Sequence, residues 1–144
     1  KPDRRQRQMC IRDRPHPHPS KKVTHDLVHS SIEGPQADNI YRGKVSLSSG
    51  SATVNLDTVS NMTDGTFVLL NRDIQCFTSN ETGWGAVKGS VSGNILTITA
   101  QDGSSTDTIS WMVVGERQDD SIKSSEIDTT DADGKIIVEL LKGS

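Results

Sequence analysis

Residues 41–58 read YRGKVSLSSGSATVNLDT, and apolar and polar residues alternate on both sides of the Ser-Ser-Gly turn. Alternation with a period of two is typical of a strand that buries one of its faces. We therefore expect a hairpin of two strands, residues 40–47 and 51–57. The apolar residues of the second strand should share one face: Ala52, Val54 and Leu56.

Further short strands follow at a spacing of about ten residues, separated by turns rich in Gly, Asn, Asp and Ser. The expected strands are residues 66–70, 74–78, a stretch around 87, 95–99, 108–114 and 135–141. Both faces of the 108–114 strand are apolar, which predicts a central strand or one whose outer face meets a neighbouring subunit. The fold class that we expect is all-β, with an antiparallel β-sandwich or jelly-roll-like domain at 40–144 and an extended lead-in at 15–39.

Two segments carry a resemblance to a known group of proteins. Residues 15–43 read PHPHPSKKVTHDLVHSSIEGPQADNIYRG, and residues 110–119 read SWMVVGERQD. In these segments and their order, residues 15–139 resemble the C-terminal β-domain of phage tail-fibre and related virion structural proteins. The resemblance implies a structural role in the virion, as a tail-fibre or appendage domain that contacts the host surface. It also implies a homotrimer, contacts with other virion proteins, and no catalytic activity.

The first fourteen residues differ in character from the rest. Residues 4–13 read RRQRQMCIRD, which resembles the in-frame translation of a common transposase-based sequencing adapter. We therefore expect residues 1–14 to be a foreign tail, with the natural protein continuing upstream of residue 15; the alternative is a natural basic tail. Without its six basic and two acidic residues, the totals of 16 and 19 become 10 and 17, and the net charge falls from −3 to −7.

Composition and motifs exclude several classes of function. The acidic body argues against nucleic acid as a partner, because phosphate binding needs clustered Lys and Arg. No apolar run reaches the roughly 18 residues that a bilayer span needs, so we expect no membrane insertion. The sequence contains no GxSxG, HExxH, GxGxxG or P-loop pattern, and we expect neither an enzyme nor a cofactor. The pairs His16/His18 and His25/His29 have spacings that zinc sites use, but a site needs three or four converging ligands, so we expect no metal.

Trp84 is the best candidate for a ligand contact. It lies between two glycines in ETGWGAVKG, with Asn80 and Glu81 nearby. An exposed indole can stack on a sugar ring, and amide and carboxylate groups can bind its hydroxyls. The three residues therefore predict a glycan site, and with it an alternative function as a carbohydrate-binding module. Trp84 as a packing residue is the competing interpretation, and a depolymerase domain is a further alternative for the chain.

A second group of residues marks the junction between the lead-in and the first strand. The resemblance is sharpest at these six residues: Glu33, Gly34, Pro35, Tyr41, Arg42 and Gly43. The Gly-Pro pair predicts a turn that sets where the first strand begins. Arg42 beside Glu33 predicts a charge-assisted hydrogen bond that would lock the junction.

Overall fold

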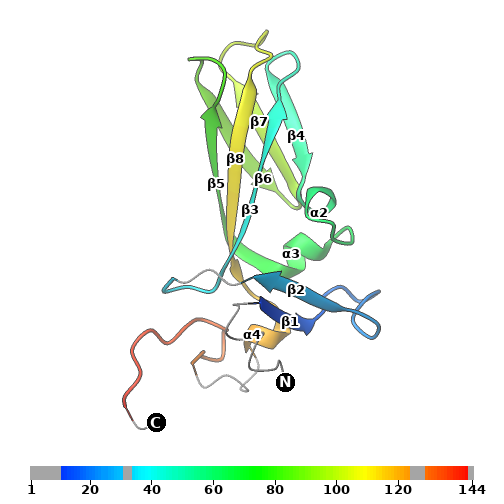
Figure 1. The fold of residues 1–144 in the computed structure, drawn as a ribbon, viewed down its shortest axis with the longest axis vertical. Coiled ribbons are helices and arrows are strands. Elements are labelled where there is room, and N and C mark those ends of the chain that lie inside the picture. The colour runs from blue at the N-terminus through cyan, green and yellow to red at the C-terminus, as the bar shows by residue number, and fades with distance from the viewer. Residues whose placement is uncertain (1–10, 31–33, 124–128, 143–144) are drawn as a thin grey trace. The chain divides into compact units, whose positions relative to one another are not determined.

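The computed structural model describes residues 11–30, 34–123 and 129–142 (Figure 1). The chain divides into two compact units. Unit 1 holds residues 1–39, 69–71 and 116–144, and unit 2 holds residues 40–68 and 72–115. Unit 2 thus begins at the residue where the sequence places the start of the sandwich, whereas residues 116–144 group with the lead-in.

Unit 2 is built around two three-stranded sheets, a few end residues of which belong to unit 1. One sheet has the order β3-β8-β5, and its strands are β3 (Asp38–Ser46), β8 (Thr108–Arg117) and β5 (Asn71–Asn80). The other has the order β4-β7-β6, and its strands are β4 (Ser51–Asn55), β7 (Ile95–Ala100) and β6 (Val87–Ser92). The antiparallel sheets pack against each other, which confirms the predicted all-β sandwich (Figure 1).

The core lies between the two sheets and is supplied by alternate residues of each strand. On β8 these residues are Ile109, Trp111 and Val113, which are at most 5% exposed. On β7, Leu96 and Ile98 are fully buried, and Leu96 stands opposite Val54 of β4 and Val91 of β6. β8 lies between β3 and β5, and this is the central position that its two apolar faces predict.

The predicted hairpin of 40–47 with 51–57 is wrong. β3 pairs with β8 and β4 pairs with β7, so the turn between them carries the chain from one sheet to the other. A single bridge, Ser48 to Ser51, joins the two segments directly. The face assignment holds, since Val54 and Leu56 are buried and Ala52 packs against the same core. The period of two identified the strands, but it carries no information on which strand is the partner.

The predicted strand at 66–70 is also wrong, because Thr66–Leu70 forms the short helix α3. The cause lies ten residues earlier. The Asp57 side chain, fully buried, accepts hydrogen bonds from the backbone N–H groups of Gly65 at 2.8 Å and Phe67 at 2.7 Å. Asp57 itself lies in the helix α2 (Leu56–Val59), which Asn55 caps by accepting from the N–H groups of Asp57 and Thr58. The buried carboxylate thus supplies acceptors to the start of a second helix.

Within unit 1, strands β1 (Ile11–Pro15) and β2 (Asp26–Ser30) pair antiparallel, and α4 (Asp120–Lys123) is a single helical turn. The lead-in is therefore not simply extended, and β1 overlaps the predicted foreign tail. The charged stretch that follows residue 115 is partly buried, since Glu116, Asp119 and Ile122 are all at most 5% exposed.

The expected final strand at 135–141 is also absent. Within the described residues, this stretch makes one isolated bridge, from Thr130 to Ile136, and no ladder. Ile137 also donates its N–H to the Thr129 carbonyl at 2.8 Å. Beyond it, Val138 and Leu140 are 66% and 50% exposed, so the apolar pattern here has no sheet to bury it.

Candidate functional site

The side chain of Asn80 makes four hydrogen bonds that hold the loop joining β5 to β6. Its Oδ1 accepts hydrogen bonds from the N–H groups of Thr82 at 3.2 Å and Gly83 at 2.9 Å. Its Nδ2 donates to the Gly85 carbonyl at 3.2 Å and to Asp107 Oδ2 at 2.9 Å. Asn80 therefore fixes the shape of the loop, and its hydrogen-bonding groups already have partners within the chain.

Gly83 lets this loop lie close to Asp107. A Cβ atom at Gly83 would lie 2.8 Å from the Asp107 Cγ, so only glycine fits without a shift. Thr82 adds a further tie, since its Oγ1 accepts from the N–H of Thr108 at the start of β8. The side chains of Asn80 and Thr82 thus anchor the loop to Asp107 and to the start of β8.

Trp84 stands at the tip of this loop and is fully exposed, with 105% of its reference surface. The interpretation of Trp84 as a packing residue is therefore wrong. An exposed indole ring can stack against a flat ligand. Because the loop already has a fixed shape, binding would cost little of the loop's conformational entropy.

Glu81 contributes to a different surface. Its carboxylate accepts a hydrogen bond from the Ser110 hydroxyl and lies 3.9 Å from the Lys44 Nζ. Both partners belong to the β3-β8-β5 sheet. Of the three residues predicted to form a glycan site, Trp84 alone is left with its side chain wholly available, while Asn80 shapes the loop.

The outer face of the β3-β8-β5 sheet carries a hollow of about 300 Å³. Its lining comes from all three strands: Arg42, Gly43, Lys44, Phe77, Thr78, Ser79, Ser110, Trp111 and Met112. Phe77 and Met112 are 48% and 36% exposed, although both belong to a sheet whose other face is the core. Sequence reasoning anticipated an apolar outer face on β8 but missed Phe77, whose signal is an aromatic residue at an outward position of β5.

The predicted junction residues have separate environments. Tyr41 is buried and packs edge-on against Phe67, with ring centroids 5.1 Å apart. Gly43 faces the core, where a Cβ would lie 2.8 Å from the Trp111 Cζ2, so its lack of a side chain makes room for the indole. Arg42 points outward and lines the hollow. Gly34 and Pro35 are exposed, and Glu33 lies outside the described residues, so the Arg42–Glu33 bond stays a prediction.

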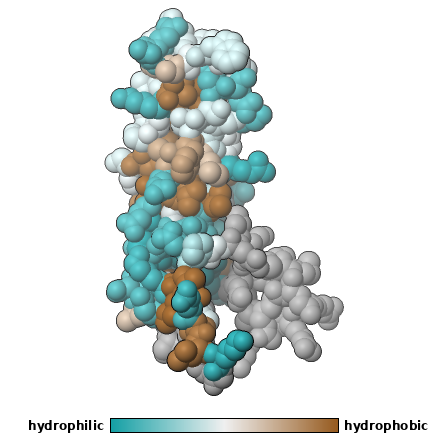
Figure 2. Space-filling model, turned by 90° about the vertical axis from the view of Figure 1, so that its left-hand side faces the viewer, coloured by the Kyte–Doolittle hydropathy of each residue, from teal (hydrophilic) through white to brown (hydrophobic). Residues whose placement is uncertain are grey.

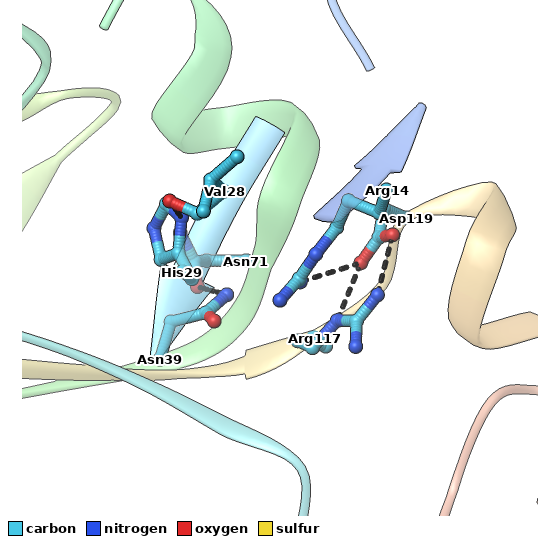
Figure 3. A network of polar contacts seen from close by, with 7 residues as sticks. All are labelled: Arg14, Val28, His29, Asn39, Asn71, Arg117 and Asp119. Carbon is cyan, nitrogen blue, oxygen red and sulfur yellow. Dashed lines mark hydrogen bonds and ion pairs between the residues drawn. The ribbon is translucent and has the colours of Figure 1, made fainter. Parts of the chain in front are cut away.

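Unit 1 contains a buried polar cluster that sequence reasoning missed (Figure 3). Arg117 donates from Nε and Nη2 to the two carboxylate oxygens of Asp119, each at 2.8 Å. The Arg14 Nη1 lies 3.8 Å from the same carboxylate, and the side chains of Arg14 and Asp119 are 6% and 2% exposed. Nearby, Asn39 donates to Asn71 at 2.9 Å, and the His29 Nδ1 lies 2.9 Å from the Val28 carbonyl oxygen.

Burial and charge shift two pKa values in this cluster. Burial alone would raise the pKa of Asp119, but the hydrogen bonds and positive charge of Arg117, together with Arg14, lower it below its usual value. Burial lowers the pKa of His29, and the charge of Arg14 lowers it further. The cluster therefore favours a charged Asp119 and a neutral His29.

Other kinds of site find no support in the part of the chain that the structure describes. There, no group of three or more His, Cys, Asp or Glu residues is arranged to hold a metal ion. Among the described helices, none is long and apolar enough to cross a membrane.

Comparison with protein-family models and with curated proteins found no match for this chain.

Proposed function

We propose that this chain is a structural domain of a phage virion, the C-terminal β-domain of a tail fibre or another appendage. Its role is to close the fibre through contacts between copies of itself and with other virion proteins, and to present loops to the host surface. The sequence resemblance over residues 15–139 supports the class of protein, and the β-sandwich is compatible with it.

The observation that carries the structural role is the outer face of the β3-β8-β5 sheet. Ile40 on β3 and Met112 on β8 are 38% and 36% exposed there. Exposed apolar side chains on a sheet face favour burial against another protein surface. A homotrimer, as expected for a fibre, would provide that surface from its own copies.

Light scattering after size exclusion tests the proposal on the full chain. A trimer or a pair of trimers is expected, and Met112→Lys should dissociate the trimers while leaving the circular dichroism of the sandwich unchanged, because Met112 points away from the core. The outward position Thr99 on β7 provides a control as Thr99→Lys, which should stay trimeric. A folded monomer at high concentration would contradict the structural role.

A carbohydrate-binding module is the second candidate, and the fully exposed Trp84 on its anchored loop favours it. Sugar rings stack on such a surface, and a glycan array on the full chain would reveal the binding. We expect Trp84→Ala to abolish any array signal and Trp84→Phe to retain part of it. Binding that is equal in the wild type and in Trp84→Ala would exclude this loop as the site.

A further inference from the structure

The two sheets of unit 2 are open at their sides, so four strands form their edges: β3, β5, β4 and β6. In the described residues, no further strand lies beyond any of these four. An open edge presents backbone N–H and C=O groups that can pair with another strand. Natural proteins protect such edges by keeping them short or by placing charges, proline or bulges on them.

Three of the edges carry a protection of this kind. β4 has five residues, β6 has six with Lys88 among them, and β3 carries Arg42 and Lys44 near its middle. β5 differs, because it has ten residues and seven in a row hold neither charge nor proline. These seven are IQCFTSN, residues 74–80. β5 is therefore the least protected edge of unit 2.

Phe77 stands at the middle of that uncharged stretch, and its side chain is 48% exposed. It forms one wall of the outer hollow, next to Met112 of the neighbouring strand. Figure 2 views the molecule from the side on which β5 lies in Figure 1, and apolar side chains gather there between polar ones. The edge thus offers apolar surface as well as backbone groups.

The backbone direction of β5 shows which groups face outward. The Glu81 N–H donates to the Thr108 carbonyl of β8 at 2.9 Å. In an antiparallel ladder alternate residues bond the same neighbour, so residues 79, 77 and 75 direct their backbone groups to β8. Cys76 and Thr78 then direct theirs to the open edge, where an added strand would bond them.

We propose that β5 pairs antiparallel with β5 of a second copy, around a two-fold axis that passes beside Phe77. Phe77 then stands opposite its own counterpart, and Gln75 stands opposite Ser79 of the other copy. A second copy fits because the uncharged stretch is centred on Phe77, so residues 74–80 of the two copies can pair with one another; the acidic Asp73 and Glu81 of the other copy meet just outside this stretch, at each of its ends. The two sheets become one of six strands, and both half-exposed rings are covered.

This inference rests on the self-association in the proposed function, but it specifies a different contact. A two-fold contact gives an even number of copies, so it would join two trimers into six copies or form a dimer. The number of copies in the particle therefore tests the proposed trimer, and chemical cross-linking tests the pairing of the β5 strands separately.

Cysteine cross-linking tests the register on the full chain with Cys10→Ser and Cys76→Ser already in place. In an antiparallel ladder, directly opposed residues that share no backbone hydrogen bond have Cα atoms about 4.5 Å apart. A disulfide can span this distance. Under mild oxidation, Gln75→Cys mixed with Ser79→Cys should form a covalent pair, and Phe77→Cys should form one alone. Gln75→Cys or Ser79→Cys alone should not, because neither residue meets itself.

Light scattering supplies the second readout. The wild type should contain an even number of copies, and Phe77→Lys should halve the mass, because it places two like charges face to face. Ser90→Lys, an outward position on the β6 edge, is the matched control and should keep the full mass.

A trimer that Phe77→Lys leaves intact, with no cross-linking in the Gln75/Ser79 mixture, would overturn this inference and leave the proposed function standing. A dimer with the expected cross-links would support the β5 contact and contradict the fibre trimer. A monomer in every variant would contradict both.

Discussion

Asp57 is the residue whose replacement should cost unit 2 the most stability. Its carboxylate is fully buried and accepts hydrogen bonds from the N–H groups of Gly65 and Phe67 and from Asn94 Nδ2, at 2.7–2.9 Å. Asp57→Ala leaves these donors without their fully buried acceptor. We expect a loss of about 3–5 kcal/mol in the free energy of unfolding, measured by urea denaturation.

Asp64→Ala is the control for this change, because Asp64 also accepts a hydrogen bond from Asn94 at 2.9 Å but lies exposed. Its loss should cost less than about 1 kcal/mol, since water can replace the carboxylate. Equal losses in the two variants would show that burial of the acceptor does not decide the effect.

At the scale of elements, the strands β1 and β2 should be sensitive to acid. His29 lies on β2, and its folded-state pKa is below the ordinary 6.5, so the unfolded chain takes up a proton that the folded chain resists. The stability that neutral His29 contributes is present above pH 6.5 and is lost as the pH falls through the folded pKa. Asp119, also with a lowered pKa, adds a second loss of the same sign below about pH 3.8.

Hydrogen exchange of the β2 amides between pH 8 and pH 3 measures this sensitivity. We expect protection to fall in two stages, with the first stage reduced in His29→Gln because that side chain cannot titrate. His16, whose pKa burial also lowers, remains in that variant and accounts for a residual first stage. Protection that is constant from pH 8 to pH 5 would contradict the assignment to His29.

Whether the sequence predicts an element correctly depends on how far apart in the chain its contacting residues lie. Alternation identified β5, β7 and β8, because a strand that covers a core must show its period locally. It failed at Thr66–Leu70, where a carboxylate ten residues away supplies acceptors to the helix start. It failed again at 135–141, where the apolar pattern is present and the described chain provides no sheet partner.

The candidate site shows the same division. Trp84 could be identified from its glycine neighbours, but its full exposure depends on how Asn80 ties the loop to Asp107, 27 residues away. Phe77 is a candidate contact because β5 lies at the edge of its sheet, and no local sequence pattern predicts whether a strand is central or at an edge. The cluster around Asp119 joins residues 14 and 117–119, a separation that sequence alone does not connect.

For the whole molecule, the division into two units predicts the effect of removing residues 1–14. All buried residues of the unit 2 core lie between Tyr41 and Val113, so a chain that begins at Pro15 should keep this core. Strand β2 loses four of its five paired residues, together with the Arg14 contact to Asp119. We therefore expect the thermal transition of buried Trp111, followed by fluorescence, to stay within about 2 °C, while the β2 amides lose protection from hydrogen exchange. Because Trp84 is already solvated, its emission changes little on unfolding and leaves Trp111 as the reporter. A Trp111 transition lowered by 10 °C or more would show instead that the two units are stabilised as one, and that residues 1–14 are part of the fold.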